Sequence, residues 1–176
     1  MTAETITYAN SDGRVLKRTL NYPWSKPTAS RPREAEEGTD LAPLLAHRGG
    51  VKRTDAIQTV GSSWQAVRTL STVDDSYGLP VEVETAVVKP NGTGESLAEQ
   101  SCTRTSYVHN ITAWLIGLPK EQRTTATPCA GHDAADPATE LKGSVRVSYD
   151  AAAYGASPSK GLPTSVSEIN GAGTAS

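Results

Sequence analysis

Polar and apolar residues alternate with a period of two in several parts of the chain. Residues 79–88 place three valines on one side and two glutamates on the other, and residues 144–149 alternate in the same way. Such alternation is typical of a half-buried β-strand, because successive side chains of a strand point to opposite faces. No window of useful length shows the 3.6-residue period of an amphipathic helix. The pattern therefore predicts an all-β chain.

Turn-forming residues divide these strands into hairpins. A run from Asn10 to Gly13 and a run from Asp74 to Gly78 each separate two strand-like segments. Glycine adopts the positive φ that tight hairpin turns require. We expect longer loops at 90–99 and 130–140. The expected strands are 5–8, 14–20, 51–60, 64–73, 79–88, 102–109, 119–127, 144–149 and 163–169.

Residues 23–50 differ from the rest of the chain. They contain Pro23, Pro27 and Pro32, a charged run at 31–37 and the pair Gly49-Gly50. These features are typical of irregular structure, so we expect an exposed loop or insertion with one short helix at 41–47. The expected parts of the chain are a first hairpin at 1–22, the insertion at 23–50, a sheet segment at 51–170 and a frayed tail at 171–176.

Two of the expected turns share a layout. Tyr8 precedes Gly13 by five places, Val73 precedes Gly78 by the same spacing, and Tyr149-Asp150 begins a third variant. A hairpin unit that recurs is typical of an array in which each unit packs against its neighbours. The residues assigned to these turns are Tyr8, Asp12, Gly13, Asp74, Asp75, Tyr77, Gly78, Tyr149, Asp150 and Gly155.

These blocks resemble the YD-repeat family, which includes bacterial Rhs proteins, the C component of insecticidal toxin complexes and the teneurin shell. The similarity is strongest from about residue 69 to residue 161. The family's short form is Tyr-Asp-x-x-Gly-Arg, and only Tyr149-Asp150 preserves its first dipeptide. Further blocks resemble actinobacterial members: Cys102 to Tyr107, Asn110, Trp114-Leu115, Leu118-Pro119, Cys129, Ser148 to Asp150, and Pro158 to Gly161.

The resemblance implies a structural role. Family members coil a long β-sheet into a hollow shell that encloses a toxic or folded C-terminal cargo. It implies neighbouring repeats and an enclosed cargo as partners, and a secreted or cell-surface location as part of a larger protein. No signal peptide follows Met1, and no sequence resembling the family's plug or cargo is present. We therefore expect an internal wall segment.

Composition and charge narrow the possible partners. Only 36% of the residues are hydrophobic and phenylalanine is missing, which fits a sheet with polar residues on both faces. The net charge of −2, with both signs mixed along the chain, argues against a nucleic-acid surface. The longest apolar run, residues 113–116, is far too short to span a bilayer.

Two cysteines allow one disulfide. A bond between Cys102 and Cys129 would close a loop of about 28 residues, worth roughly 3.5 kcal/mol in the chain-entropy model. Two buried free thiols are the alternative. Neither cysteine has the spacing of a metal ligand.

The sequence contains no convincing catalytic or metal site. His47, His109 and His132 are widely separated, so a zinc site would need all three to meet by tertiary coincidence. Adjacent Asp74 and Asp75 would point to opposite faces of a strand and not toward one glycosidic bond. We expect a chain that is not an enzyme and needs no cofactor.

Two other functions stay open. A secreted β-domain could bind carbohydrate or a cell-surface partner, with Trp64, Tyr77, Trp114 and Tyr154 as stacking residues. Such a role would require exposed rings. A small hydrolase would require a concave pocket in which a base reaches a nucleophile.

Overall fold

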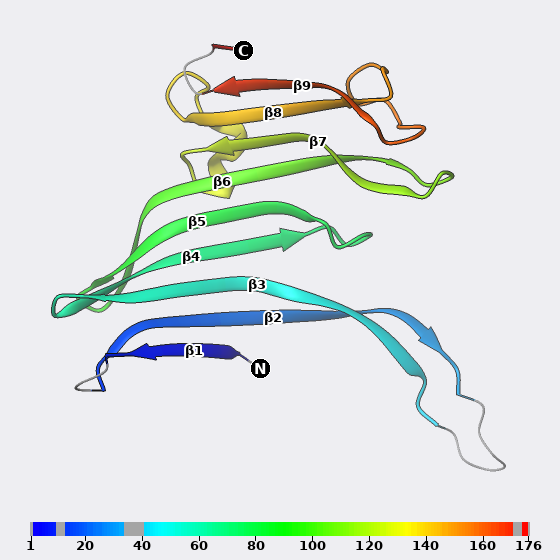
Figure 1. Ribbon diagram of the computed structural model, residues 1–176. Coiled ribbons are helices and arrows are strands. Elements are labelled where there is room, and N and C mark those ends of the chain that lie inside the picture. The colour runs from blue at the N-terminus through cyan, green and yellow to red at the C-terminus, as the bar shows by residue number, and fades with distance from the viewer. Residues whose placement is uncertain (1, 10–12, 34–40, 171–173, 176) are drawn as a thin grey trace.

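The computed structural model describes residues 2–9, 13–33, 41–170 and 174–175. Within these residues the chain forms one ten-stranded sheet in which every strand pairs with its sequence neighbours in antiparallel fashion (Figure 1). The expectation of an all-β chain built from consecutive antiparallel hairpins is therefore confirmed. The strands are β1 (Ala3–Tyr8), β2 (Val15–Arg31), β3 (Leu44–Val60), β4 (Ser63–Val73), β5 (Pro80–Asn91), β6 (Gly94–Asn110), β7 (Leu115–Thr125), β8 (Leu141–Tyr149), β9 (Pro163–Asn170) and β10 (Thr174–Ala175).

The expected irregular insertion at 23–50 and its helix at 41–47 are wrong. Residues up to Arg31 continue β2 and residues from Leu44 onward belong to β3, so the two strands form one long hairpin. Pro23 and Pro27 are tolerated because β1 pairs with β2 only as far as Asn21. Beyond that residue, β2 is an edge strand, and a missing N–H on the free side removes no ladder hydrogen bond.

The glycine pair also has a role within this hairpin. A Cβ atom on Gly49 would lie 2.8 Å from the Trp24 carbonyl oxygen, and one on Gly50 would lie 3.1 Å from the Trp24 ring nitrogen. The absence of side chains lets β3 approach Trp24 closely. The two glycines therefore serve strand packing and do not mark a loop.

Two shorter segments also differ from expectation. β5 and β6 are joined by a two-residue turn at 92–93, where a loop over 90–99 was expected. Gly92 has a φ of +54° in this turn. In the expected tail, Thr174 pairs with Asn170 and Ala175 pairs with Ile169. The remaining tail residues, 171–173 and 176, lie outside the described residues.

Strand register gives the sheet two chemically different faces, because directly paired residues project to the same side. We call one the charged face, which carries Asp55, Arg68, Glu82, Glu84, Arg104, Glu121, Arg123 and Arg146. We call the other the neutral face, which carries Val67, Thr69, Val83, Thr85, Val87, Thr103, Thr124, Val145 and Val147.

The 3₁₀ helix η1 (Cys129–Ala134) packs over β5 and β6. Beneath it, Cys102 and Thr125 are fully buried. Other buried side chains on the charged face are Ala66, Ala86, Val88, Asp55 and Ser144. The core is therefore small, and most of it lies on the charged face.

A single layer leaves much of the chain exposed. The accessible surface is 11562 Å², whereas a compact monomer of 18.5 kDa exposes about 8,200 Å². Neither face is covered by a second sheet within the described residues. The two sheet edges are formed by β1 on one side and by β9 with the short β10 on the other.

Candidate functional site

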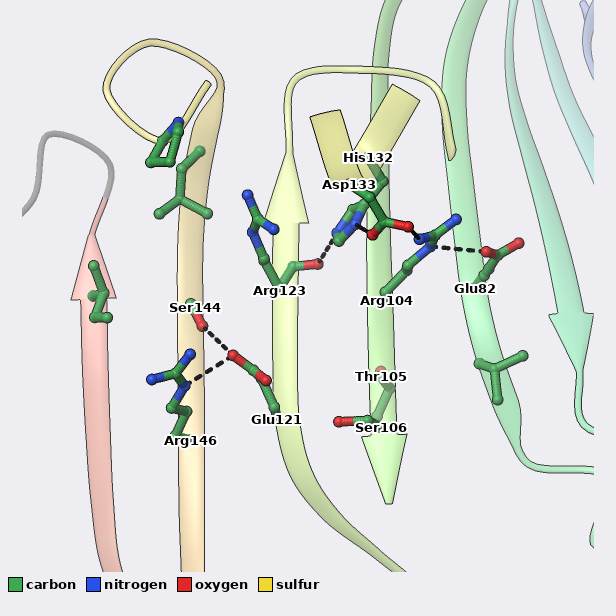
Figure 2. A pocket seen from close by; sticks show the side chains of 14 residues that line it. Glu82, Arg104, Thr105, Ser106, Glu121, Arg123, His132, Asp133, Ser144 and Arg146 are labelled. Carbon is green, nitrogen blue, oxygen red and sulfur yellow. Dashed lines mark hydrogen bonds and ion pairs between the residues drawn. The ribbon is translucent and has the colours of Figure 1, made fainter. Parts of the chain in front are cut away.

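A hollow of about 800 Å³ lies on the charged face, and Figure 2 shows the side chains that line it. They come from five consecutive strands, β5 to β9, and from the η1 segment. Most of the labelled residues are charged. Their partners determine what chemistry the hollow can perform.

Arg104 is the centre of one charged group. Its guanidinium pairs with Asp133 at 2.6 Å and with Glu82 at 2.8 Å, and it donates a hydrogen bond to the Cys129 carbonyl at 3.0 Å. The contact with Glu82 is an ion pair without good hydrogen-bond alignment. Arg104, followed by His132, lowers the pKa of the Asp133 carboxyl. The group holds η1 against the sheet.

His132 is the only histidine in the hollow. It is 3% exposed, and its two ring nitrogens contact Asp133 Oδ1 and the Arg123 carbonyl oxygen, both at 3.2 Å (Figure 2). Because both nitrogens have protein partners, neither is open to serve as a general base or a metal ligand. This imidazole ties η1 to β7.

Glu121 is the centre of the second charged group. Arg146 donates to it at 2.8 Å and the Tyr154 hydroxyl donates at 2.9 Å. Burial alone would raise the pKa of Glu121, but these two donors lower it below its usual value. In both groups the carboxylates are paired with an arginine. Among the described residues, no set of three or more His, Cys, Asp or Glu side chains could hold a metal ion.

Asp74 closes the β4–β5 turn. Its carboxylate accepts hydrogen bonds from the N–H groups of Ser76, Tyr77 and Leu79 at 2.9, 2.6 and 2.6 Å. Burial tends to raise the pKa of Asp74, yet these N–H groups lower it overall. The neighbouring Asp75 points elsewhere and pairs with Lys26 at 2.6 Å. The two carboxylates therefore have separate structural partners.

Asp150 closes the β8–β9 turn in a similar way. Its carboxylate accepts hydrogen bonds from the N–H groups of Ser159, Lys160, Gly161 and Leu162. These donors, with Lys160 the strongest, hold the pKa of Asp150 far below its usual value. Its N–H donates to the Leu162 carbonyl, as the Asp74 N–H donates to the Leu79 carbonyl.

The glycine that closes the third turn is Gly161 and not Gly155. Gly161 has a φ of +76° and directly precedes the leucine that bonds to Asp150, as Gly78 with a φ of +69° precedes Leu79. Gly155 has a φ of +81° within the longer loop between them. The loop after Asp150 is longer than the loop after Asp74, so the closing glycine is farther along the chain than the spacing of the earlier turn predicts.

In the first hairpin, the described residues on either side of the turn form the same backbone hydrogen bond. The Ala9 N–H donates to the Arg14 carbonyl at 2.8 Å, and Gly13 has a φ of +69°. Tyr8 ends β1 and is exposed. Asp12 lies outside the described residues.

A tripeptide that the sequence analysis overlooked marks two of these turns and the first part of β7. Gly-Leu-Pro occurs at 78–80, 117–119 and 161–163, and each glycine has a positive φ. Each proline pairs with the residue that follows a β-bulge or other register shift in the preceding strand: Val73, Tyr107 or Tyr149. A search for repeated tripeptides would have found this unit. All three Gly-Leu-Pro units lie at the same end of the sheet, at the right in Figure 1.

Consecutive Gly-Leu-Pro units are linked by equivalent tyrosine hydroxyl and proline carbonyl groups. The Tyr107 hydroxyl donates to the Pro80 carbonyl at 2.7 Å, and the Tyr149 hydroxyl donates to the Pro119 carbonyl at 2.8 Å. In the first two units, the leucine side chain also lies against the glycine of the next unit. This holds for Leu79 with Gly117 and for Leu118 with Gly161. We call this series of contacts the turn ladder.

The four candidate stacking residues do not form one platform. Trp64 begins β4 at one end of the sheet, whereas the other three belong to turns at the opposite end. Tyr77 packs against His109 with ring centroids 4.8 Å apart, and Tyr154 is held by Glu121. Trp114 is 79% exposed and has a φ of +56°. Only this last ring is freely presented.

Cys102 and Cys129 form a disulfide bond. It joins β6 to the first residue of η1 across a sequence separation of 27. The Cys129 N–H also donates to Glu84 at 2.7 Å. The bond therefore fastens the only helical segment within the described residues to the charged face.

No protein-family model matches the chain, and no curated protein or solved structure matches it either. The resemblance to the YD-repeat family therefore stays a prediction. Within the described part of the chain, no helix is long enough and apolar enough to cross a membrane.

Proposed function

We propose that this chain is a non-catalytic wall segment of a YD-repeat shell that encloses or presents a toxin-like cargo. Its partners would be neighbouring repeats and that cargo, and its location would be secreted or at the cell surface within a larger protein. No cofactor takes part in this role.

The observation that carries the proposal is the open single-layer sheet. An isolated globular domain buries its apolar side chains between two layers. This sheet instead exposes large apolar side chains on several strands, including Val67 on β4, Leu97 on β6 and Val166 on β9. A wall that has cargo on one side and solvent or other repeats on the other requires such a layer.

The turn ladder supports the same proposal. Three Gly-Leu-Pro units follow each other along one end of the sheet and contact one another through equivalent atoms. Repeat proteins are built in this way, because each unit is stabilised mainly by its neighbours. The ion pairs of the hollow, which link strands and η1, fit a structural role as well.

Carbohydrate binding is the alternative function, and the hollow next to β1 and β2 favours it most. It has a volume of about 660 Å³ and includes Tyr22, Trp64 and the ion-paired Arg53, Asp55 and Arg68. However, the Arg53 guanidinium lies 4.7 Å from the centre of the Tyr22 ring. This arginine occupies the ring face that a sugar would need.

Sedimentation velocity over a range of concentrations tests the wall proposal. Unpaired edge strands associate, so we expect the chain to form larger species as its concentration rises. Val166→Lys places a charge on edge strand β9 and should reduce this association. Val67→Lys makes the same change at a comparably exposed valine of central strand β4 and should leave association unchanged.

A chain that stays monomeric at every concentration would contradict the wall proposal. Retention on a polysaccharide that is lost in Trp64→Ala would support the alternative instead.

A further inference from the structure

The turn ladder is incomplete at its last turn, residues 161–163. The two earlier Gly-Leu-Pro units each have a leucine that contacts the next glycine and a proline carbonyl that accepts a tyrosine hydroxyl. Leu162 has the leucine position in the last turn but is 59% exposed, whereas Leu79 and Leu118 are half-buried. Within the described residues, no side chain donates to the Pro163 carbonyl.

The backbone holds this last turn in the same geometry as the earlier ones. The Leu162 carbonyl accepts a hydrogen bond from the Asp150 N–H at 2.8 Å, and its N–H donates to the Asp150 carboxylate at 3.0 Å. Pro163 pairs with Tyr149 after a register shift, as Pro119 pairs with Tyr107. Leu162 and the Pro163 carbonyl are therefore presented from a fixed turn.

The outer edge of β9 is also open beside this turn. β10 pairs only with Ile169 and Asn170, at the far end of β9. Along the rest of β9, no described residue forms a second ladder, so its outward backbone groups lack strand partners. In the earlier units this position is filled, because β6 lies beside β5 and β8 lies beside β7.

We propose that the outer edge of β9, together with Leu162 and the Pro163 carbonyl, is the docking site for one further strand and turn. The docked strand runs antiparallel to β9, carries a tyrosine after a β-bulge, and continues into a turn closed by a left-handed glycine. This inference rests on the proposed function and specifies the chemistry of the neighbouring repeat.

Each required feature follows from the two completed contacts. A tyrosine is needed because its ring spans to the proline carbonyl and its hydroxyl donates the hydrogen bond; phenylalanine has no donor. A glycine is needed because a Cβ on Gly117 or Gly161 would lie 3.0 or 3.1 Å from the leucine of the preceding turn. The positive φ of both glycines excludes most other residues independently.

The test is a binding experiment with a labelled peptide that copies residues 141–163 of this chain, which contain both required features. The full chain is titrated into the peptide at low micromolar concentration, and fluorescence anisotropy is measured. We expect saturable binding. Tyr149→Phe in the peptide should weaken it about fivefold, the equivalent of one net hydrogen bond.

Two variants of the full chain locate the site. Leu162→Ala should weaken peptide binding by about fivefold or more, because the leucine loses its contact with the docked glycine. Leu97→Ala removes an equally apolar side chain on β6, exposed and away from the last turn, and should leave binding unchanged.

Failure of this inference differs from failure of the wall proposal. The inference is overturned if the peptide does not bind, or if its affinity is the same with and without both Tyr149→Phe and Leu162→Ala. Self-association that remains sensitive to Val166→Lys would still support the wall in that case. An equal loss of peptide affinity in the Leu162→Ala and Leu97→Ala chains would also overturn the proposed site.

Discussion

Replacing Cys102 and Cys129 together by alanine should lower the free energy of unfolding by about 3.5 kcal/mol. The bond joins residues separated by 27 positions, and the loop that it closes contains all of β7. In the chain-entropy model, a loop of about 28 residues restricts the unfolded chain by that amount. With a urea m-value of about 2 kcal/mol/M, the unfolding midpoint should fall by about 1.7 M.

The structure also predicts which segments become less stable first when the disulfide is removed. The bond fastens η1 over fully buried Thr125, and the Cys129 N–H donates to Glu84. Amide hydrogen exchange should therefore accelerate in η1 and at the end of β7 before it changes in β2 and β3. Urea titration monitored by circular dichroism measures the overall loss, and mass spectrometry of exchanged peptides locates it.

Reduction provides the matched control. The natural chain in excess dithiothreitol should unfold at nearly the same urea concentration as the double variant. The reasoning is refuted if the double variant and the untreated chain have equal midpoints. It is refuted equally if two thiols titrate in the denatured, unreduced protein.

Three further predictions follow from the turns and the charged face. The N–H donors around Asp150 depress its pKa below the usual 3.8, so the native chain binds fewer protons than the unfolded chain as acid is added. Stability should therefore be full above about pH 5 and fall below about pH 4; Asp150→Asn should flatten this decline in urea midpoints measured from pH 2 to 7. Gly161→Ala should lower the free energy of unfolding in urea by about 2 kcal/mol, because the alanine would have both a positive φ and a Cβ in close contact with a leucine. Gly13→Ala should lower it by about 1 kcal/mol, because φ is again positive but nothing lies within 4 Å of the new Cβ. Asp55→Ala leaves two arginines without their buried partner and should lower the free energy of unfolding by about 2 kcal/mol. Glu95→Gln, at the exposed end of the same network, should lower it by less than about 1 kcal/mol. Equal losses in the two variants would contradict this prediction.

The turn ladder explains how a thin sheet with a small core keeps its turns in place. Each tyrosine hydroxyl and each leucine side chain links one turn to the next, so the contacts run across the strands and supplement the backbone ladder. Asp74 and Asp150 organise their own turns from within. The geometry at this end of the sheet therefore depends on both local contacts within a turn and contacts between neighbouring units.

Local patterns in the sequence were enough to locate part of each strand from β1 to β9. The alternation at residues 79–88 reappears as β5, with Val83 and Val87 on the neutral face and its glutamates on the charged face. Asp74 and Gly78 were recognised as turn residues, and the structure gives both of them that role. These features were accessible because side-chain alternation and positive φ are properties of a few consecutive residues.

Only the tertiary structure decided the role of residues whose meaning depends on a partner strand. Pro23 and Gly49 looked like loop residues, but β2 is an edge strand there and β3 must approach Trp24 closely. The spacing suggested Gly155 as the closing glycine, whereas the hydrogen bonds of Asp150 select Gly161. The Tyr149 contact with Pro119 likewise requires strand register. Register brings together residues that are far apart in the chain, and local sequence patterns carry little information about which distant strand is the partner.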